Sequence, residues 1–339
     1  NSKIKGHFLD DSADFKLDIT ADYFKYRNLE FKTLDLTHVM DSNNVAISYH
    51  IDDVTIGDTS LFSDVFYKGS GLQDILNSSI SWGQNTMNES SLIWETKIFD
   101  WDHYNFVLEP SYLSIQELRW EVENASEFSV KNDTISVNEF ELRRNDQFIS
   151  LNGTASKDRD HKLFFNVENI ILEELSTLLN KVPFAGTLEA KGHISDPFND
   201  FQFIGDGTID TLTVKEQLIG NINVNSEWIE GIKGLKLLGD LDYRDAQTFD
   251  FLGYYYPFKK EDNLDFNLDF DKTDISFTNA FFSPDLVTGI SGFLDGQLKV
   301  SGSTDYPILE GDVHLISGAA KVGILGASFG VDGIIEVDE

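Results

Sequence analysis

The feature that most constrains the fold of this chain is a glycine-marked pattern that occurs twice in its C-terminal half. Each copy reads G-x-L-x-x-x-G, then a few polar residues and a proline, and a constant offset of 110 residues separates the copies. At Gly205 and Gly311 the offset falls to 106, so the first copy has four extra residues in its turn. The other paired positions are Gly186, Gly192 and Pro197 in the first copy and Gly296, Gly302 and Pro307 in the second.

Self-similarity with one turn insertion is typical of stacked structural units. The pattern therefore predicts one continuous elongated domain in which residues 148–247 and residues 248–339 are repeat units. Residues 1–147 are expected to form the N-terminal part of the same extended sheet, with a repeat that is too weak to draw.

Alternation of apolar and polar residues predicts β-strands along most of the chain. Between residues 264 and 270, four apolar side chains alternate with Asp265, Asn267 and Asp269. Successive side chains of a strand point to opposite faces, so this strand has one apolar and one acidic face. An all-β fold with a few short helices follows, in which the repeated units build a long curved sheet. The residues expected on the apolar face are Leu163, Phe165, Val167, Leu188, Leu264, Phe266, Leu268, Phe270, Leu298 and Val300.

Short helices are expected at three places between the strands. Residues 170–179 carry apolar side chains at helical spacing, with Asn169 as the N-cap and Pro183 beyond the end. A weaker pattern of the same kind covers residues 72–76. Pro284 is expected in the first turn of the third helix, which Gly289 ends.

The composition indicates a folded and strongly acidic chain. The 339 residues include 58 Asp and Glu against 26 Lys and Arg, a formal net charge of −32, while 41% of the residues are hydrophobic. That hydrophobic fraction argues against disorder. Because no basic stripe is present to contact a phosphate backbone, nucleic acid is not an expected partner. The absence of cysteine excludes disulfides, thiolate metal sites and a cysteine nucleophile.

No catalytic motif has the surroundings that its chemistry needs. Residues 326–330 match G-x-S-x-G, which in hydrolases lies between a strand and a helix, but the residues that follow predict a strand. The seven His residues and the Asp clusters lack the spacing of known metal sites. We therefore expect no enzyme activity, no cofactor and no metal.

The predicted apolar face has two interpretations. Its side chains can pack against a second layer of the protein, as half-buried strands usually do. Alternatively, the sheet curls into a trough whose apolar face covers lipid tails. The few short helices expected here leave much of the face without an evident protein partner, which favours the trough.

The pattern of residues 296–313, with residues 318–339 and residues 133–156, resembles the translocation and assembly module TamB family. This family is AsmA-like and related to the bridge-like lipid transfer proteins. The resemblance implies a β-taco, which is a long sheet folded lengthwise around a hydrophobic groove. It also implies a periplasmic location, an inner-membrane anchor in the full-length parent, and cooperation with a BamA-type outer-membrane barrel protein. The family has no catalytic residues to assign.

Together these expectations give a function, an alternative and a set of partners. The preferred function is that of a segment conducting phospholipid along the groove between inner and outer membranes, in support of outer-membrane biogenesis. The alternative is a scaffold or chaperone for outer-membrane barrel proteins, which binds client strands by β-augmentation. The expected partners are phospholipid and the barrel protein, and a monomer is expected.

Overall fold

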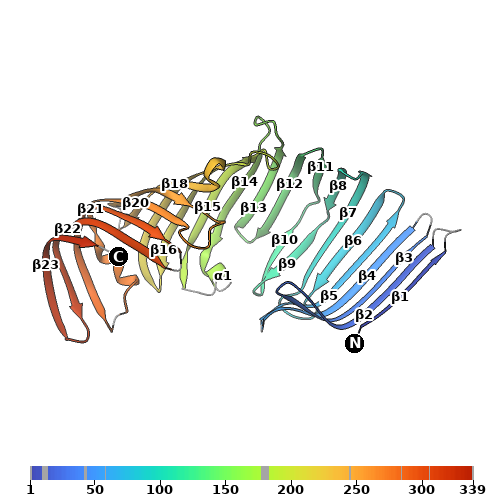
Figure 1. The fold of residues 1–339 in the computed structure, drawn as a ribbon, viewed down its shortest axis with the longest axis horizontal. Helices are drawn as coiled ribbons and strands as arrows, with labels where there is room; N and C mark the ends of the chain where they lie inside the picture. The colour runs from blue at the N-terminus through green and yellow to red at the C-terminus, as the bar shows by residue number, and fades with distance from the viewer. Residues whose placement is uncertain are drawn as a thin grey trace. The chain divides into compact units, whose positions relative to one another are not determined.

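The computed structural model describes residues 2–9, 14–41, 44–57, 59–176, 183–243, 246–283, 285–304 and 306–337 (Figure 1). The protein is all-β, with 76% of its residues in strands, short helical segments and one long antiparallel sheet of 23 strands. The predicted fold class is confirmed. The chain divides into two compact units, unit 1 at Asn1–Ser156 and unit 2 at Lys157–Glu339. The three-part division drawn from the repeat stays a prediction.

Unit 1 is built from antiparallel hairpins in chain order, with one interruption. From β1 to β8 each strand pairs with the next. Between β7 and β12, the short strands β8 and β11 pair with each other, and β9 and β10 form a separate hairpin. β7 pairs with both β8 and β9, and β12 pairs with both β10 and β11, so the two short pairs bridge these strands. The strands are β1 Ser2–Leu9, β2 Asp14–Tyr26, β3 Leu29–Met40, β4 Asn44–Ile56, β5 Thr59–Leu72, β6 Ile75–Trp82, β7 Ser90–Asp100, β8 His103–Leu108, β9 Ser111–Ile115, β10 Leu118–Val122, β11 Ser126–Lys131, β12 Thr134–Arg144 and β13 Gln147–Ala155.

Unit 2 is a simple meander, in which every strand from β14 to β23 pairs with the next along the chain. Figure 1 shows these strands side by side, from green to red. The elements are β14 Leu163–Ile171, α1 Leu172–Ser176, β15 Phe184–Ser195, β16 Gln202–Val214, β17 Gln217–Ile229, the 3₁₀ helix η2 Glu230–Ile232, β18 Gly234–Tyr243, β19 Ala246–Tyr255, β20 Leu264–Asp274, the 3₁₀ helix η3 Ile275–Ala280, β21 Val287–Gly302, β22 Pro307–Val322 and β23 Ala327–Val337.

Polar turn residues in left-handed conformation connect many of the strands. Both residues of the two-residue turn between β16 and β17 have positive φ, 49° at Lys215 and 65° at Glu216. Asn132 and Asp133 form the corresponding turn between β11 and β12, with φ of 42° and 54°. Turns of this backbone conformation match the right-handed twist of the strands that they join. The hairpins of the meander thus follow from local turn chemistry.

Single residues with positive φ also interrupt strands. The residue Asn169 has a φ of 55° and lies at the register shift between Val167 and Ile170 in β14. Lys272, with a φ of 48°, lies at the corresponding shift in β20. In β3 the apolar alternation changes parity at Thr33, which has a φ of 49°. Such irregularities redirect the side chains that follow and increase the local twist.

The expected helices are mostly wrong in extent or place. Ile170 and Ile171 belong to β14, Asn169 is at a register shift and not an N-cap, and α1 covers only Leu172–Ser176. Residues 177–179 of the predicted helix lie outside the described residues. An i, i+3, i+4 pattern cannot distinguish a helix from a strand whose alternation a bulge has shifted, which explains the error.

The other two predicted helices are absent from the described residues. Leu72 pairs with Ile75 across a two-residue turn between β5 and β6, in which Gln73 has a φ of 56°. A helix at residues 283–289 is also wrong, because β21 begins at Val287, and Pro284 lies outside the described residues. The helical turn of this region is η3, which begins earlier. It is capped by the Asp274 carboxylate, which accepts a 2.9 Å hydrogen bond from the Ser276 amide.

The two glycine-marked copies occupy equivalent strands but differ in register. Gly186 lies in β15 and Gly296 in β21, with φ of 142° and 133°, values that favour glycine. The partner of Phe165 is Gly192, whereas the partner of Phe266 is Val300 instead of Gly302. The second copy is thus displaced by two residues. A shift by an even number keeps every side chain on its original face.

The turn insertion also shows in the strand boundaries. Pro197 lies in the loop of residues 196–201 between β15 and β16, while Pro307 is the first residue of β22. The second connection spans only residues 303–306. Proline at the first position of a strand leaves the hydrogen-bonding ladder intact, because no amide is lost from its interior.

Candidate functional site

The candidate site is an apolar face that crosses the sheet of unit 2. Residues that are partners in adjacent antiparallel strands point to the same side of the sheet. In β14 and β15, Phe165 is opposite Gly192 and Val167 is opposite Ala190. Leu163 occupies the same face, two residues from Phe165 along the strand.

The same rule carries the face through the rest of the unit. One row of partners runs Phe165, Gly192, Gly205, Ser226, Leu237, Gly253, Phe266, Val300 and Leu309, from β14 to β22. A second row runs Val167, Ala190, Gly207, Val224, Gly239, Phe251, Leu268 and Leu298. A third runs Ile170, Leu188, Ile209, Ile222, Leu241, Phe249, Phe270, Gly296, Val313 and Ile335. We call these three rows, with Leu163 and Leu264 beside them, the apolar face of unit 2.

All ten residues predicted to line a groove therefore lie on this one face. Phe270 and Leu298 are buried, at 6% and 8% relative exposure, and the other eight are half-buried. Phe270 and Leu298 form a small cluster with Val313 of β22. Their role in binding a ligand stays a prediction, because shared orientation does not identify what covers a face.

Aromatic rings cover the glycines of this face. A Cβ built on Gly192 would lie 2.7 Å from Cζ of Phe165, and one on Gly205 would lie 3.2 Å from the same atom. The ring of Phe165 also stacks on Phe203, with centroids 5.5 Å apart. Because glycine leaves bare backbone on a sheet, an aromatic ring laid over it restores packing. The face is thus a layer of flat rings and short aliphatic side chains.

The opposite face of β20 is polar and acidic. Asp265, Asn267 and Asp269 occupy the alternate positions of β20. Lys299 in β21 forms a 3.7 Å ion pair with Asp265, and both side chains are about half-exposed. An exposed pair of this kind adds little to stability. The same side also carries Ile204, Leu238 and Leu252, which are exposed at 47%, 49% and 43%, so the face is acidic at β20 and mixed over the neighbouring strands.

A small hydrophobic cluster closes one end of the apolar face. Leu241 and Ala280 are buried at 3% and 2% relative exposure, and Phe249 and Phe277 pack against them. Ala280 and Phe277 belong to η3, so the 3₁₀ helix covers the third row where it crosses β18 and β19. Among the described residues, every strand belongs to the one sheet, and no separate β-layer covers the remainder.

An open apolar pocket lies beside this cluster. Its volume is about 470 Å³, and its wall is almost entirely hydrocarbon. The lining residues come from α1, β15, β16, the turn between β16 and β17, and the segment after η3: Leu172, Phe184, Ile209, Leu212, Val214, Lys215 and Phe281. Ile209 also belongs to the third row, so the pocket opens directly onto the apolar face.

Unit 1 carries an apolar face of its own. Its centre is a ladder of aromatic rings from successive strands, in which Tyr49 stacks on Tyr67 at 4.9 Å between ring centroids. Trp94, Phe106 and Phe128 continue the ladder, with consecutive centroids 5.9 Å and 5.5 Å apart. Alternation marks Tyr49 and Phe128, which have polar neighbours on both sides. It does not mark the other three, because each of them has an apolar neighbour on one side.

Sequence reasoning missed several members of the face in unit 2. In β18 the sequence shows apolar residues alternating with charged ones: Leu235, Leu237 and Leu241 with Lys236 and Asp240. This alternation was sufficient to predict that the three leucines share a face. Phe249 and Phe251 of β19 carry a similar signal with Asp250 between them. Strand boundaries were needed to use it, and these depend on turns that composition marks only weakly.

No helix among the described residues is long and apolar enough to cross a membrane. The structure thus shows an all-β protein with one long antiparallel sheet, in which unit 2 has a continuous apolar face. Comparison with family models, with curated proteins and with solved structures yields no match for this chain.

Proposed function

We propose that the apolar face of unit 2 binds phospholipid acyl chains and conducts them along the sheet. The observation that carries this proposal is the continuity of the face, which runs through β14–β23 without a charged side chain in its three rows. Most of its members are only half-buried. Apolar surface of this extent is usually covered by a partner or a ligand.

The free energy of an acyl chain in water explains why such a surface is useful. Each methylene group removed from water contributes about 0.8 kcal/mol, so a chain of about 16 carbons costs roughly 12 kcal/mol to expose. A face of rings and aliphatic side chains offsets this cost at every step along the sheet. The pocket lined by Leu172 and Phe281 gives the acyl chain a place to enter or leave the apolar face.

The cellular setting of the proposal follows from the resemblance to the TamB family. In that setting the chain is a periplasmic segment of an inner-membrane-anchored parent and works with a BamA-type outer-membrane barrel. Phospholipid passing along the face would then supply the outer membrane. The acidic polar face keeps the outside of the conduit hydrated and unattractive to anionic headgroups.

The test places one added charge on either face of the same strand. Phe266→Asp puts a carboxylate on the apolar face, and Asn267→Asp puts the same group one residue away on the polar face. Because burying an unpaired charge against hydrocarbon costs several kcal/mol, we expect at least about tenfold less bound phospholipid in the first variant. We expect no change in the second. Native mass spectrometry with lipid extraction, after expression in a Gram-negative periplasm, measures both.

A second variant protects this test from a folding artefact. The ring of Phe266 covers Gly253, so its loss also perturbs the sheet. Val300→Asp changes the partner of Phe266 on the same face without removing an aromatic ring. Circular dichroism establishes that each variant is folded. Equal lipid in wild type and in both folded apolar-face variants would refute the proposal.

Edge strands favour the second candidate function, a chaperone that binds client strands. Among the described residues, β23 pairs only with β22, and its side chains Phe329, Val331 and Ile334 are exposed at 45%, 49% and 79%. An exposed apolar edge can add a strand from another chain. Val331→Pro removes one amide from the edge strand, so it would impair client capture and leave lipid binding intact. We expect the Phe266→Asp variant to lose lipid binding and to keep client capture.

A further inference from the structure

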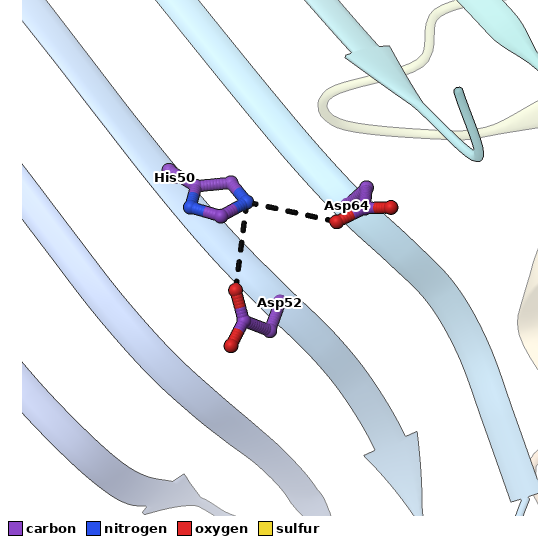
Figure 2. Close-up of side chains that lie close together, drawn as sticks. All are labelled: His50, Asp52 and Asp64. Carbon is purple, nitrogen blue, oxygen red and sulfur yellow. Dashed lines mark ion pairs between the residues drawn. The ribbon is translucent and has the colours of Figure 1, made fainter. Parts of the chain in front are cut away.

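A cluster of one imidazole and two carboxylates lies on the face of unit 1 opposite the aromatic ladder, because His50 alternates with Tyr49 along β4. His50 and Asp52 are on β4, and Asp64 is on the adjacent strand β5 (Figure 2). The imidazole Nε2 of His50 lies 3.6 Å from Oδ1 of Asp52 and 3.8 Å from Oδ1 of Asp64. The three atoms fall within 4.8 Å of one another. Three groups that commonly bind metal ions thus converge on a single point.

The imidazole nitrogen at the centre of this cluster is unsatisfied. Nε2 of His50 is buried and has no hydrogen-bond partner among the described residues. Both carboxylate oxygens are too far away for a hydrogen bond, which requires about 2.7–3.2 Å from nitrogen to oxygen. Among the described residues, no Lys or Arg is ion-paired with Asp52 or Asp64, although both carboxylates are half-exposed. Buried polar atoms are nearly always hydrogen-bonded or bound to an ion, so this nitrogen needs a partner that the described residues do not supply.

The backbone holds the three side chains in this arrangement. Asp64 has a φ of 48°, and the register of β4 and β5 puts it opposite Asp52, between the partners Ile51–Val65 and Asp53–Ser63. The ring of His50 stacks on Phe66 with centroids 4.2 Å apart and an interplanar angle of 13°. This stacking restricts rotation of the imidazole ring. Figure 2 shows the ring nitrogen directed towards both carboxylates.

The separations fit a metal ion bound between the three atoms. Zinc bonds to imidazole nitrogen and carboxylate oxygen are about 2.0–2.2 Å long. In the tetrahedral geometry of zinc, two such ligands are therefore about 3.3–3.6 Å apart. The observed distances are 3.6 Å and 3.8 Å, so a movement of a few tenths of an ångström brings the three atoms to bonding distance of one ion. One imidazole and two carboxylates also match the ligand preference of zinc.

We propose that His50 Nε2, one Asp52 oxygen and one Asp64 oxygen bind a divalent transition-metal ion, with Zn²⁺ as the expected ion. Water completes the coordination on the solvent side, where both carboxylates are exposed. The ion joins β4 to β5 and neutralises two carboxylates in a chain with a formal net charge of −32. This site belongs to unit 1, whereas the acyl-chain proposal concerns unit 2, so the two proposals are independent.

Two variants and one control test the site on the full 339-residue chain. Asp64→Asn removes a carboxylate ligand and suits the left-handed backbone, which asparagine adopts readily. His50→Gln removes the imidazole. Asp35→Asn is the control, because Asp35 is the partner of His50 on β3 and carries the same charge outside the cluster. Metal-free protein is titrated with Zn²⁺ by isothermal calorimetry, and the ¹⁵N resonances of the seven histidines are followed by NMR.

The proposal expects one Zn²⁺ per chain and a large shift of the His50 Nε2 resonance on binding. We expect affinity to weaken at least about tenfold in both ligand variants and less than about twofold in the control. Binding that all three variants weaken equally would show a diffuse charge effect and overturn the proposal. A His50 resonance unmoved by Zn²⁺ would also overturn it.

Discussion

Two glycines on the apolar face, Gly192 and Gly207, differ in the space around a Cβ atom, so alanine at each position tests how tightly the face is packed. A Cβ at Gly192 would clash with the carbonyl oxygen of Ile204 and would lie 2.7 Å from both the Cα of Gly205 and Cζ of Phe165. A Cβ at Gly207 would meet its nearest atoms at 3.4–3.8 Å, which is normal van der Waals contact. The two positions lie in adjacent strands of the same face, so they differ in little besides the space available.

The magnitudes follow from these contacts. Two of the three clashes at Gly192 involve backbone, which cannot move without disturbing the β15–β16 ladder, so Gly192→Ala costs about 1–3 kcal/mol of unfolding free energy. Gly207→Ala changes it by about zero or raises it by up to about 1 kcal/mol, because alanine restricts the unfolded chain. For a unit of this size each kcal/mol shifts the melting temperature by about 2–4 °C.

Thermal unfolding followed by circular dichroism compares the two variants with wild type. The expected melting temperature of Gly207→Ala is at or above that of wild type, and that of Gly192→Ala is about 2–12 °C below it. Urea unfolding supplies the free energies when heating is irreversible. Equal stability of the two variants, or a less stable Gly207→Ala, would refute the packing argument for this face.

Two further predictions concern the same strands. Phe165→Ala uncovers Gly192 and loses the stacked ring contact, so we expect about 2–4 kcal/mol lower unfolding free energy, measured by urea titration; a loss below about 0.5 kcal/mol would contradict it. Burial, and secondarily the positive charge of Lys162, lowers the pKa of His193 below its ordinary value of 6.5. The unfolded chain therefore binds this proton first, and stability falls as the pH drops below about 6.5 towards the folded pKa. His193→Asn should flatten this dependence in unfolding titrations between about pH 7 and pH 5, and an unchanged slope would contradict the assignment.

The sequence predicted the faces of strands better than the positions of helices. Parity placed Leu264, Phe266 and Leu268 on one side of β20, because side chains alternate wherever a chain is extended. Helical spacing failed at Ile170 and Ile171, where a bulge in β14 imitates a period of 3.6 residues. Turns of two residues, such as the one closing β5 onto β6, were read as part of a helix for the same reason.

The cluster of His50, Asp52 and Asp64 shows a different limit of prediction from sequence. His50 and Asp52 are two residues apart, so parity puts them on one side of β4. Asp64 joins them because the register between β4 and β5 puts it opposite Asp52, between the pairs Ile51–Val65 and Asp53–Ser63. No spacing rule for metal ligands covers residues brought together by a strand pairing of this kind, so the sequence predicted no metal site.

The sequence alone determined the fold class, the two glycine-marked copies and the orientation of the ten apolar residues, since each depends on local alternation and local turn chemistry. Tertiary structure decided the register of each pair of strands. It displaced the second copy by two residues and left the faces intact, because only even shifts keep apolar side chains together. It also decided which rings cover which glycines and which carboxylates face His50, because these contacts join residues that only strand pairing makes neighbours.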